Sequence, residues 1–177
     1  GLGRSTPWEP AVELIGQIGG DVVAVEVRDS RAYLAVGPRM VILDVSQPER
    51  PIRIGQSLIL SQKLEDITIA DHLAFLANGD DGVQIVDISD PTHPTLRGVY
   101  DTPSKAQGVS TVAGMAYVVD AESGLHILDV SDPANPVRRG GYDTMGEASS
   151  IHVVVHTQRL ANGDARAVLN ALELAVE

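Results

Sequence analysis

Short apolar runs, some of them alternating with polar residues, divide this chain into segments of strand length. The clearest set lies in the middle of the sequence, at residues 66–69, 74–77, 83–87 and 95–100. Each run is bounded by Gly, Pro, Asp or Asn, and short runs between such turn formers are typical of β-strands. Residues 165–176, rich in Ala, Leu and Glu, could also form a short helix, but their register with the rest of the pattern favours a strand.

The same set of runs recurs with a nearly constant period. A polar segment, Ser-x-Pro-x-x-Pro, marks each copy, and its four occurrences are 41, 43 and 42 residues apart, at Ser5, Ser46, Ser89 and Ser131. An aromatic residue keeps the same period at Tyr33, Phe75 and Tyr117. A repeat of roughly 40–45 residues that contains four strands is the signature of a propeller blade. The pattern therefore predicts an all-β fold, either a β-propeller or a segment of one.

The repeat also predicts how the chain is divided. We expect a single repeat domain over residues 1–177, with whole blades at 19–60, 61–102 and 103–145. Residues 146–177 resemble a degenerate partial blade, since the sequence Leu-Ala-Asn-Gly-Asp at 160–164 repeats that of 76–80 two periods later. This alignment places the residues around Arg159 and Leu160 in a second strand and 167–170 in a third.

The two ends of the chain carry complementary parts of a further blade. Residues 5–18 hold a Ser-Pro segment and a strand that no preceding unit accounts for. This strand could be the outer strand of a composite blade formed with the C-terminal strands, which would close about four blades of four antiparallel strands into a ring. Because the chain begins at Gly1 in the middle of a repeat, we expect it to be a piece of a longer protein.

The apolar runs 40–44, 83–87 and 125–129 resemble the motif that names the LVIVD repeat. The flanks also match: an Ala-aromatic strand, a Gly-containing turn and the segment Asp-Val/Ile-Ser-Asp-Pro-x-x-Pro. The resemblance covers residues 5–150 well, with departures at Gln47 and at Asn170. It implies a bacterial or archaeal propeller at the cell surface or outside the cell, and it implies no particular activity.

Composition narrows the possible partners. The formal net charge is −11 and the few Lys and Arg residues are scattered, with Arg138-Arg139 the only adjacent pair, so binding of a nucleic-acid backbone is not expected. The chain has no Cys, which excludes disulfides and thiolate metal sites. No apolar run reaches the ~18–20 residues that a transmembrane helix needs. We expect no cofactor.

Recurrent aspartates raise the question of calcium binding. Asp44, Asp87 and Asp129 occupy one position of the repeat, but successive blades would hold them apart. An aspartate before a Ser-x-Pro turn can instead accept backbone N–H bonds and fix the corner, which is the role we predict for all three. The acidic turns at 78–82 and 120–124 lack the alternating oxygen ligands of a calcium loop, so no metal site is predicted, although weak calcium binding stays open.

The histidines and hydroxyl residues form no catalytic signature. His152 and His156 would share one face of a strand but stand about 13 Å apart at ~3.3 Å per residue, which is too far for one ion. The sequence contains no Gly-x-Ser-x-Gly nucleophile motif and no phosphate-binding loop.

One face of the predicted propeller offers the best candidate contact surface. The connections between blades share this face with the turns between second and third strands, and two of them repeat Tyr-Asp-Thr. Tyrosine suits a binding surface because it offers a large area with a polar tip, although packing against the adjacent blade would equally explain the repetition. The candidate contacts are Tyr100, Asp101, Lys105, Tyr142, Asp143, Asp80, Asp81 and Glu122.

The sequence therefore predicts a non-enzymatic scaffold that binds a protein or another surface ligand. Two alternatives remain: an enzyme with its site at the propeller axis, and a purely structural segment that belongs to a longer propeller or assembles with copies of itself. The first strands of the blades offer no convergent set of His, Asp and Glu residues, which weakens the enzyme hypothesis.

Overall fold

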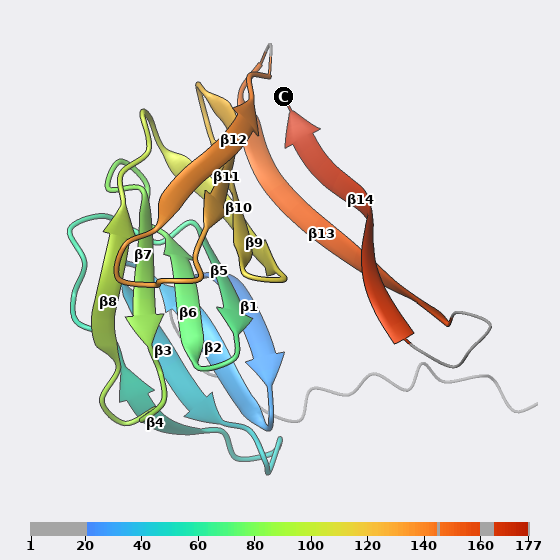
Figure 1. Ribbon diagram of the computed structural model, residues 1–177. Helices are drawn as coiled ribbons and strands as arrows, with labels where there is room; N and C mark the ends of the chain where they lie inside the picture. The colour runs from blue at the N-terminus through green and yellow to red at the C-terminus, as the bar shows by residue number, and fades with distance from the viewer. Residues whose placement is uncertain (1–20, 145, 160–164, 177) are drawn as a thin grey trace, which may run out of the picture.

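The computed structural model describes residues 21–144, 146–159 and 165–176, and these residues form β-sheets joined by turns and loops (Figure 1). The first sheet contains β1 (Val22–Arg28), β2 (Arg31–Val36), β3 (Arg39–Asp44) and β4 (Ile52–Gln56). The second contains β5 (Asp66–Ala70), β6 (Leu73–Ala77), β7 (Val83–Asp87) and β8 (Thr95–Tyr100). The third contains β9 (Ala106–Val112), β10 (Met115–Asp120), β11 (Gly124–Asp129) and β12 (Val137–Tyr142), and a two-stranded sheet follows, with β13 (Ala148–Arg159) and β14 (Ala165–Val176).

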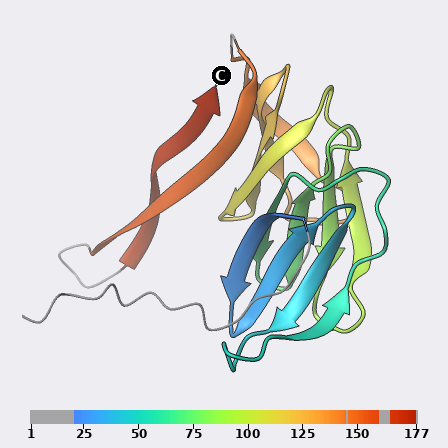
Figure 2. The ribbon, with the colours of Figure 1, turned by 180° about the vertical axis from the view of Figure 1, so that it is seen from behind.

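Each four-stranded sheet is an antiparallel meander in which strands adjacent in sequence pair with one another. The first strands of successive sheets, β1, β5, β9 and β13, lie beside one another as the inner strands, and β4, β8 and β12 lie at the periphery (Figures 1 and 2). This is the arrangement of propeller blades, so the predicted all-β propeller architecture is confirmed. Among the described residues, β13 does not pack beside β1 as β5 does, and the sheets form an arc that is not closed.

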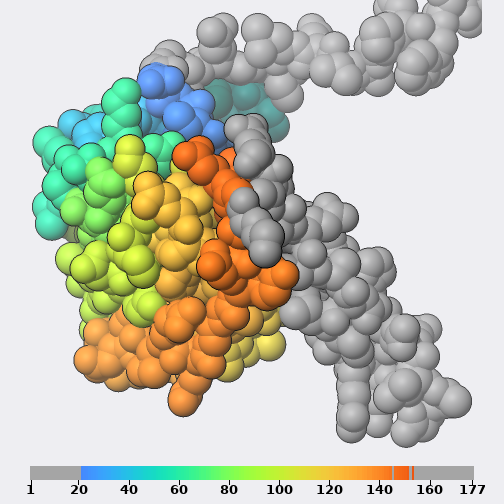
Figure 3. All heavy atoms as spheres, turned by 90° about the horizontal axis from the view of Figure 1, so that it is seen from above, coloured from blue at the N-terminus to red at the C-terminus, as the bar shows by residue number. Residues whose placement is uncertain are grey.

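The core lies between the sheets, and the space-filling view shows the first three packed directly against one another in sequence order (Figure 3). The repeated aromatic residue of each second strand faces the following sheet. Tyr33 lies in a buried cluster with Ile67 and Leu76 of the second sheet, and Phe75 lies in the next cluster with residues of the third. Tyr117 packs in the same way against Ala148 and Ile151 at the start of β13.

The inner strands are also joined by hydrogen bonds between neighbouring sheets. An inner strand has no further strand beside it, so every second N–H group faces away from its own sheet. The Ile69 N–H donates to Oε2 of Glu26 at 2.8 Å, and the Val109 N–H donates to Oδ2 of Asp66 at 2.9 Å. Arg28 adds a bond from its guanidinium to the carbonyl oxygen of Ile69 at 3.0 Å. Carboxylates from one sheet thus satisfy the free edge of the next.

The Ser-Pro segments form the corners between third and fourth strands, and they also join neighbouring sheets. The loop of the second sheet packs on Gly55 of β4, where a Cβ atom would overlap the carbonyl oxygen of Pro91. The loop of the third sheet packs in the same way on Gly98 of β8, against the carbonyl oxygen of Pro133. Glycine is required at these positions because two backbones approach too closely for a side chain.

The C-terminal residues differ from the repeat alignment. Residues 165–176 are a strand rather than a helix, as expected, but β14 pairs directly with β13 and so occupies the place of a second strand, not a third. The alignment was wrong because β13 continues to Arg159 without a break where the other inner strands end after five to seven residues. Residues 160–164 and the predicted outer strand within 5–18 lie outside the described residues.

We expect Gly98→Ala to destabilise the fold by about 1–3 kcal/mol, because the new methyl group must displace the backbone of the neighbouring Ser-Pro loop. Arg97→Ala, at the exposed adjacent position, is the matched control and should change the free energy of unfolding by less than about 0.5 kcal/mol. Urea denaturation followed by circular dichroism measures both changes. Equal stability of the two variants would contradict the close packing of loop and strand.

Candidate binding face

One face of the arc is built from the turns between second and third strands and from the connections between sheets, and we call it the connection face. Backbone hydrogen bonds hold the connections against the turns on both sides. The Leu60 N–H donates to the Pro38 carbonyl at 2.7 Å, and the Ala106 N–H donates to the Gly79 carbonyl at 2.9 Å. The Ala121 N–H donates to the carbonyl of Lys105 at 2.9 Å. The connections 57–65 and 101–105 are therefore held in place by backbone hydrogen bonds to the turns beside them.

The residues predicted as contacts lie on the connection face in two groups. One group surrounds the junction of the second and third sheets and contains Asp80, Asp81, Tyr100, Asp101 and Lys105. The other lies at the outer end of the third sheet and contains Glu122, Tyr142 and Asp143. All are exposed except Asp81 and Tyr100, which are half-buried. Asp81 is further engaged by the hydroxyl of Ser61, which reaches it from the preceding connection.

The two tyrosines that repeat in sequence have different surroundings. Tyr100 packs against the second core cluster, and its ring lies 6.2 Å from the ring of His126 in the following sheet. Burial accordingly raises the pKa of the Tyr100 hydroxyl. Tyr142 is 70% exposed. Packing against the next sheet accounts for Tyr100, whereas Tyr142 presents its ring to solvent.

A buried carboxylate organises the turn beside Tyr100. Asp120 is fully buried, and its oxygens accept hydrogen bonds from the N–H groups of Ser104 at 2.7 Å, Ser123 at 2.9 Å and Glu122 at 3.1 Å. Burial alone would raise the pKa of Asp120, but these donors outweigh burial and hold the pKa below its usual value. Asp120 therefore stays ionised and ties the connection 101–105 to the following turn.

His126 fills the space between the second and third sheets. It is 3% exposed, and its Nε2 lies 3.1 Å from the Ser123 hydroxyl, while Nδ1 has no hydrogen-bond partner among the described residues. Burial lowers the pKa of His126, and the nearby Arg138 guanidinium lowers it further, although Asp120 opposes the shift. The imidazole is therefore neutral near pH 7 and packs as an apolar ring against Tyr100.

The structure adds an apolar groove that the sequence reading missed. It has a volume of about 420 Å³, lies at the outer junction of the first two sheets, and is lined by the connection 57–61 and by Gln84, Val86, Pro94 and Leu96. Leu58 is 72% exposed and Ile59 is 68% exposed, although backbone bonds fix both ends of this segment. The sequence does contain a signal for this groove: three consecutive apolar residues, 58–60, lie in a connection that we expected on the connection face.

The inner strands border a second, polar cavity of about 410 Å³. Glu26 and Asp66 both line it, so the structure brings together two carboxylates that the sequence reading did not connect. Burial, with a smaller contribution from the charge of Glu26, raises the pKa of Asp66. Both carboxylates already accept N–H groups of neighbouring sheets, and their evident role is to join the inner strands.

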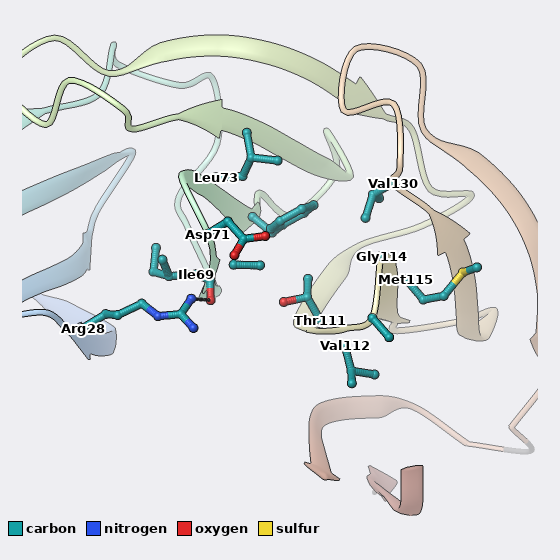
Figure 4. A pocket seen from close by; sticks show the side chains of 12 residues that line it. Arg28, Ile69, Asp71, Leu73, Thr111, Val112, Gly114, Met115 and Val130 are labelled. Carbon is teal, nitrogen blue, oxygen red and sulfur yellow. Dashed lines mark hydrogen bonds between the residues drawn. The ribbon is translucent and has the colours of Figure 1, made fainter. Parts of the chain in front are cut away.

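A third cavity of about 330 Å³ opens at the turns between first and second strands, away from the connection face (Figure 4). Arg28 borders it while donating to Ile69, and Asp71 and Gly114 line the turns. Asp71 has a φ of 51° and Gly114 a φ of 76°, both values of tight turns. These residues are accounted for by turn geometry and by contacts between sheets.

The recurrent aspartates Asp44, Asp87 and Asp129 accept hydrogen bonds from the N–H group two residues later, at 2.8, 2.9 and 3.0 Å. This is the geometry of an Asx turn at the corner before each Ser-Pro segment. Hydrogen bonding from Ser131, together with the Arg139 guanidinium, lowers the pKa of Asp129 to about 2. In the part of the chain whose side chains are described, no three His, Asp or Glu residues are grouped to hold a metal ion. His152 and His156 lie on β13, and their side chains are outside that part.

Comparisons with known proteins agree with this architecture. The profile of the LVIVD repeat matches residues 19–57, 63–102 and 103–144. No protein of curated function matches the chain. Among solved structures, the computationally designed Ika4 protein has a TM-score of 0.66 at 8% identity, over 90% of this chain and 99% of Ika4. The computationally designed Ika8 protein has a TM-score of 0.62 at 7% identity, over 88% of this chain but only 45% of Ika8. At these identities the likeness shows the fold alone.

We expect Tyr100→Ser to lower the free energy of unfolding by about 1–2 kcal/mol, because it removes a ring that packs between sheets. Tyr142→Ser removes an exposed ring and should change stability by less than about 0.5 kcal/mol. Thermal and urea denaturation of the two single variants distinguish these expectations. A stable Tyr100→Ser variant would show that this ring is free for contacts.

The buried histidine should make stability depend on pH. Because the pKa of His126 is lower in the folded protein than the ~6.5 of an unfolded chain, the unfolded state binds more protons just below that pH. The free energy of unfolding should therefore fall as the pH falls from about 6.5 to the folded pKa. His126→Gln, which introduces the residue found at the equivalent Gln84, should lose this contribution. Urea denaturation between about pH 5 and 8 measures it, and parallel curves for both proteins would refute it.

Proposed function

Because the chain belongs to the LVIVD repeat family, we propose that it is a non-enzymatic β-propeller scaffold that binds a protein partner through the connection face. The family resemblance supports a location at the cell surface or outside the cell. No helix that is long and apolar enough to cross a membrane occurs among the described residues. The two carboxylates of the polar cavity accept backbone N–H groups, which supports a role in joining the inner strands rather than in catalysis.

The observation that carries this proposal is the exposure of Leu58 and Ile59 beside the groove. Exposed side chains of this size are usual in a loose loop, where they can turn away from water at little cost. Here the Ser57 N–H donates to the Met40 carbonyl at 2.9 Å, and the Leu60 N–H is bonded to Pro38. The Ser57 hydroxyl also accepts the Met40 N–H at 2.9 Å. A rigid segment that holds two large apolar side chains in water is typical of a binding surface.

The charges around the groove indicate the chemistry of the partner. The connection face carries an excess of carboxylates, including Glu65, Asp80, Asp81, Asp101 and Asp143. Asp81 accepts a hydrogen bond from Ser61, which lines the groove. With a net charge of −11, the chain attracts cationic partners and repels anionic ones. The partner that fits best is a protein segment with one or two apolar side chains that enter the groove, flanked by Lys or Arg.

We expect this partner chemistry to emerge from selection against a random peptide library. Peptides enriched on the wild-type chain should combine an apolar side chain with flanking Lys or Arg residues. Leu58→Ser/Ile59→Ser should weaken their binding at least tenfold, because it removes the apolar wall of the groove. Fluorescence anisotropy of a labelled, selected peptide measures the change, and rising salt should weaken binding to the wild-type chain.

The matched control is Val137→Ser, which removes a 49% exposed side chain from β12, outside the groove. It should leave peptide affinity unchanged. Circular dichroism should show both variants folded, since all three changes affect exposed side chains. If selected peptides bind the double variant as tightly as the wild type, the groove is not the binding site.

A further inference from the structure

The inner strand of the first sheet is exposed where its counterparts are buried. Val25 pairs with the second strand of its sheet at the same register as Ile67 and Val109 do in theirs. Ile67 and Val109 are 5% and 2% exposed, because the preceding sheet covers them, whereas Val25 is 59% exposed. Val27 is 63% exposed, against 4% for its counterpart Ile69. β1 therefore presents the face that elsewhere receives a preceding sheet.

The opposite end of the arc has contact positions that are unfilled among the described residues. Gly140 of β12 corresponds to Gly55 and Gly98, on which the Ser-Pro loops of following sheets pack. No described atom lies within 4 Å of a Cβ atom built at Gly140. Tyr142, the counterpart of the half-buried Tyr100, is 70% exposed. The third sheet thus lacks the outer part of a following blade.

We propose that a second copy of this chain covers the exposed face of β1, so that two arcs close one ring through two identical interfaces. At each interface, β13 of one copy lies beside β1 of the other and covers Val25 and Val27. The interface continues the contact that already joins β1 to β5, β5 to β9 and β9 to β13 within one chain. This inference is independent of partner binding at the connection face.

The separation of β13 from β1 within one chain favours a second copy over closure of a single chain. In a ring of four sheets β13 would pack against β1 of the same chain, and the described strands do not do so. A twofold axis between two copies instead places the free side of β13 in each copy against the exposed β1 of the other.

Ser150 identifies the contact across the proposed interface. Asp66 immediately precedes Ile67 and reaches the Val109 N–H of the next sheet, and Gly108 lies in the same way against Ile151. Ser150 precedes Ile151 on β13 and is exposed, so it occupies the corresponding position of the last sheet. By this repeat its neighbour across the interface is Val25 of the second copy.

The first test is the mass in solution. Light scattering coupled to size-exclusion chromatography should give twice the 18.7 kDa of one chain. Val25→Lys/Val27→Lys should return the protein to the monomer mass with its β-sheet circular dichroism retained, because both side chains are exposed in a single arc. Val99→Lys/Val137→Lys, at outer-strand positions that are 45% and 49% exposed, is the control and should remain a dimer. A monomeric wild type at every concentration overturns the proposal.

Disulfide cross-linking gives a second readout. The chain has no native cysteine, so only the introduced cysteines can form disulfides. Oxidation of a mixture of Val25→Cys and Ser150→Cys chains should yield a covalent dimer on a non-reducing gel, and a mixture of Val25→Cys and Val137→Cys chains should not. In the double variant Val25→Cys/Ser150→Cys, bonds between chains support the two-copy ring. A bond within one chain would show that a single copy closes on itself, and this outcome overturns the proposal.

Discussion

Each four-stranded sheet of this protein has two apolar faces, and the rest of the structure follows from the need to cover both. In the middle sheet every residue of β6, from Leu73 to Ala77, is buried, so this strand has no solvent side at all. Its successive side chains face opposite sides, since Phe75 faces the following sheet and Ala74 and Leu76 face the preceding one. A unit of this kind is stable only between neighbours, which explains why it occurs as a repeat.

Covering the faces also fixes the loops that carry the candidate site. Where two sheets pack face to face, the connection between the sheets crosses their junction at one end. The Ser-Pro corner loop of the following sheet crosses the junction at the other end. The corner loops approach so closely that glycine is needed at Gly55 and Gly98, and the connections are bonded to turns on both sides. The connection face is consequently rigid, and exposed apolar side chains on it can bind without first being ordered.

The features that recur in every repeat could be predicted from the sequence, whereas the features that are specific to one repeat could not. The sheets, their order and the shared face of the loops follow from positions that recur every 42 residues or so. The different surroundings of Tyr100 and Tyr142 do not, because they depend on whether a complete sheet follows. The long β13 departs from the repeat, so alignment misplaced the strand after it. The sequence did not predict that Glu26 and Asp66 line one cavity, because the two residues occupy different positions of their repeats, opposite Tyr33 and Ala77.

Two pairs of exposed apolar residues in this chain differ in kind, and comparison between repeats separates them. Val25 and Val27 have buried counterparts in the other sheets, so their exposure reflects a contact that the repeat normally makes. Leu58 and Ile59 have no such counterparts, because the connection between β4 and β5 spans residues 57–65 whereas that between β8 and β9 spans only 101–105. A further sheet can cover the first pair but leaves the second pair exposed. The ends of the arc therefore fit another blade, whereas the groove fits a partner of a different kind.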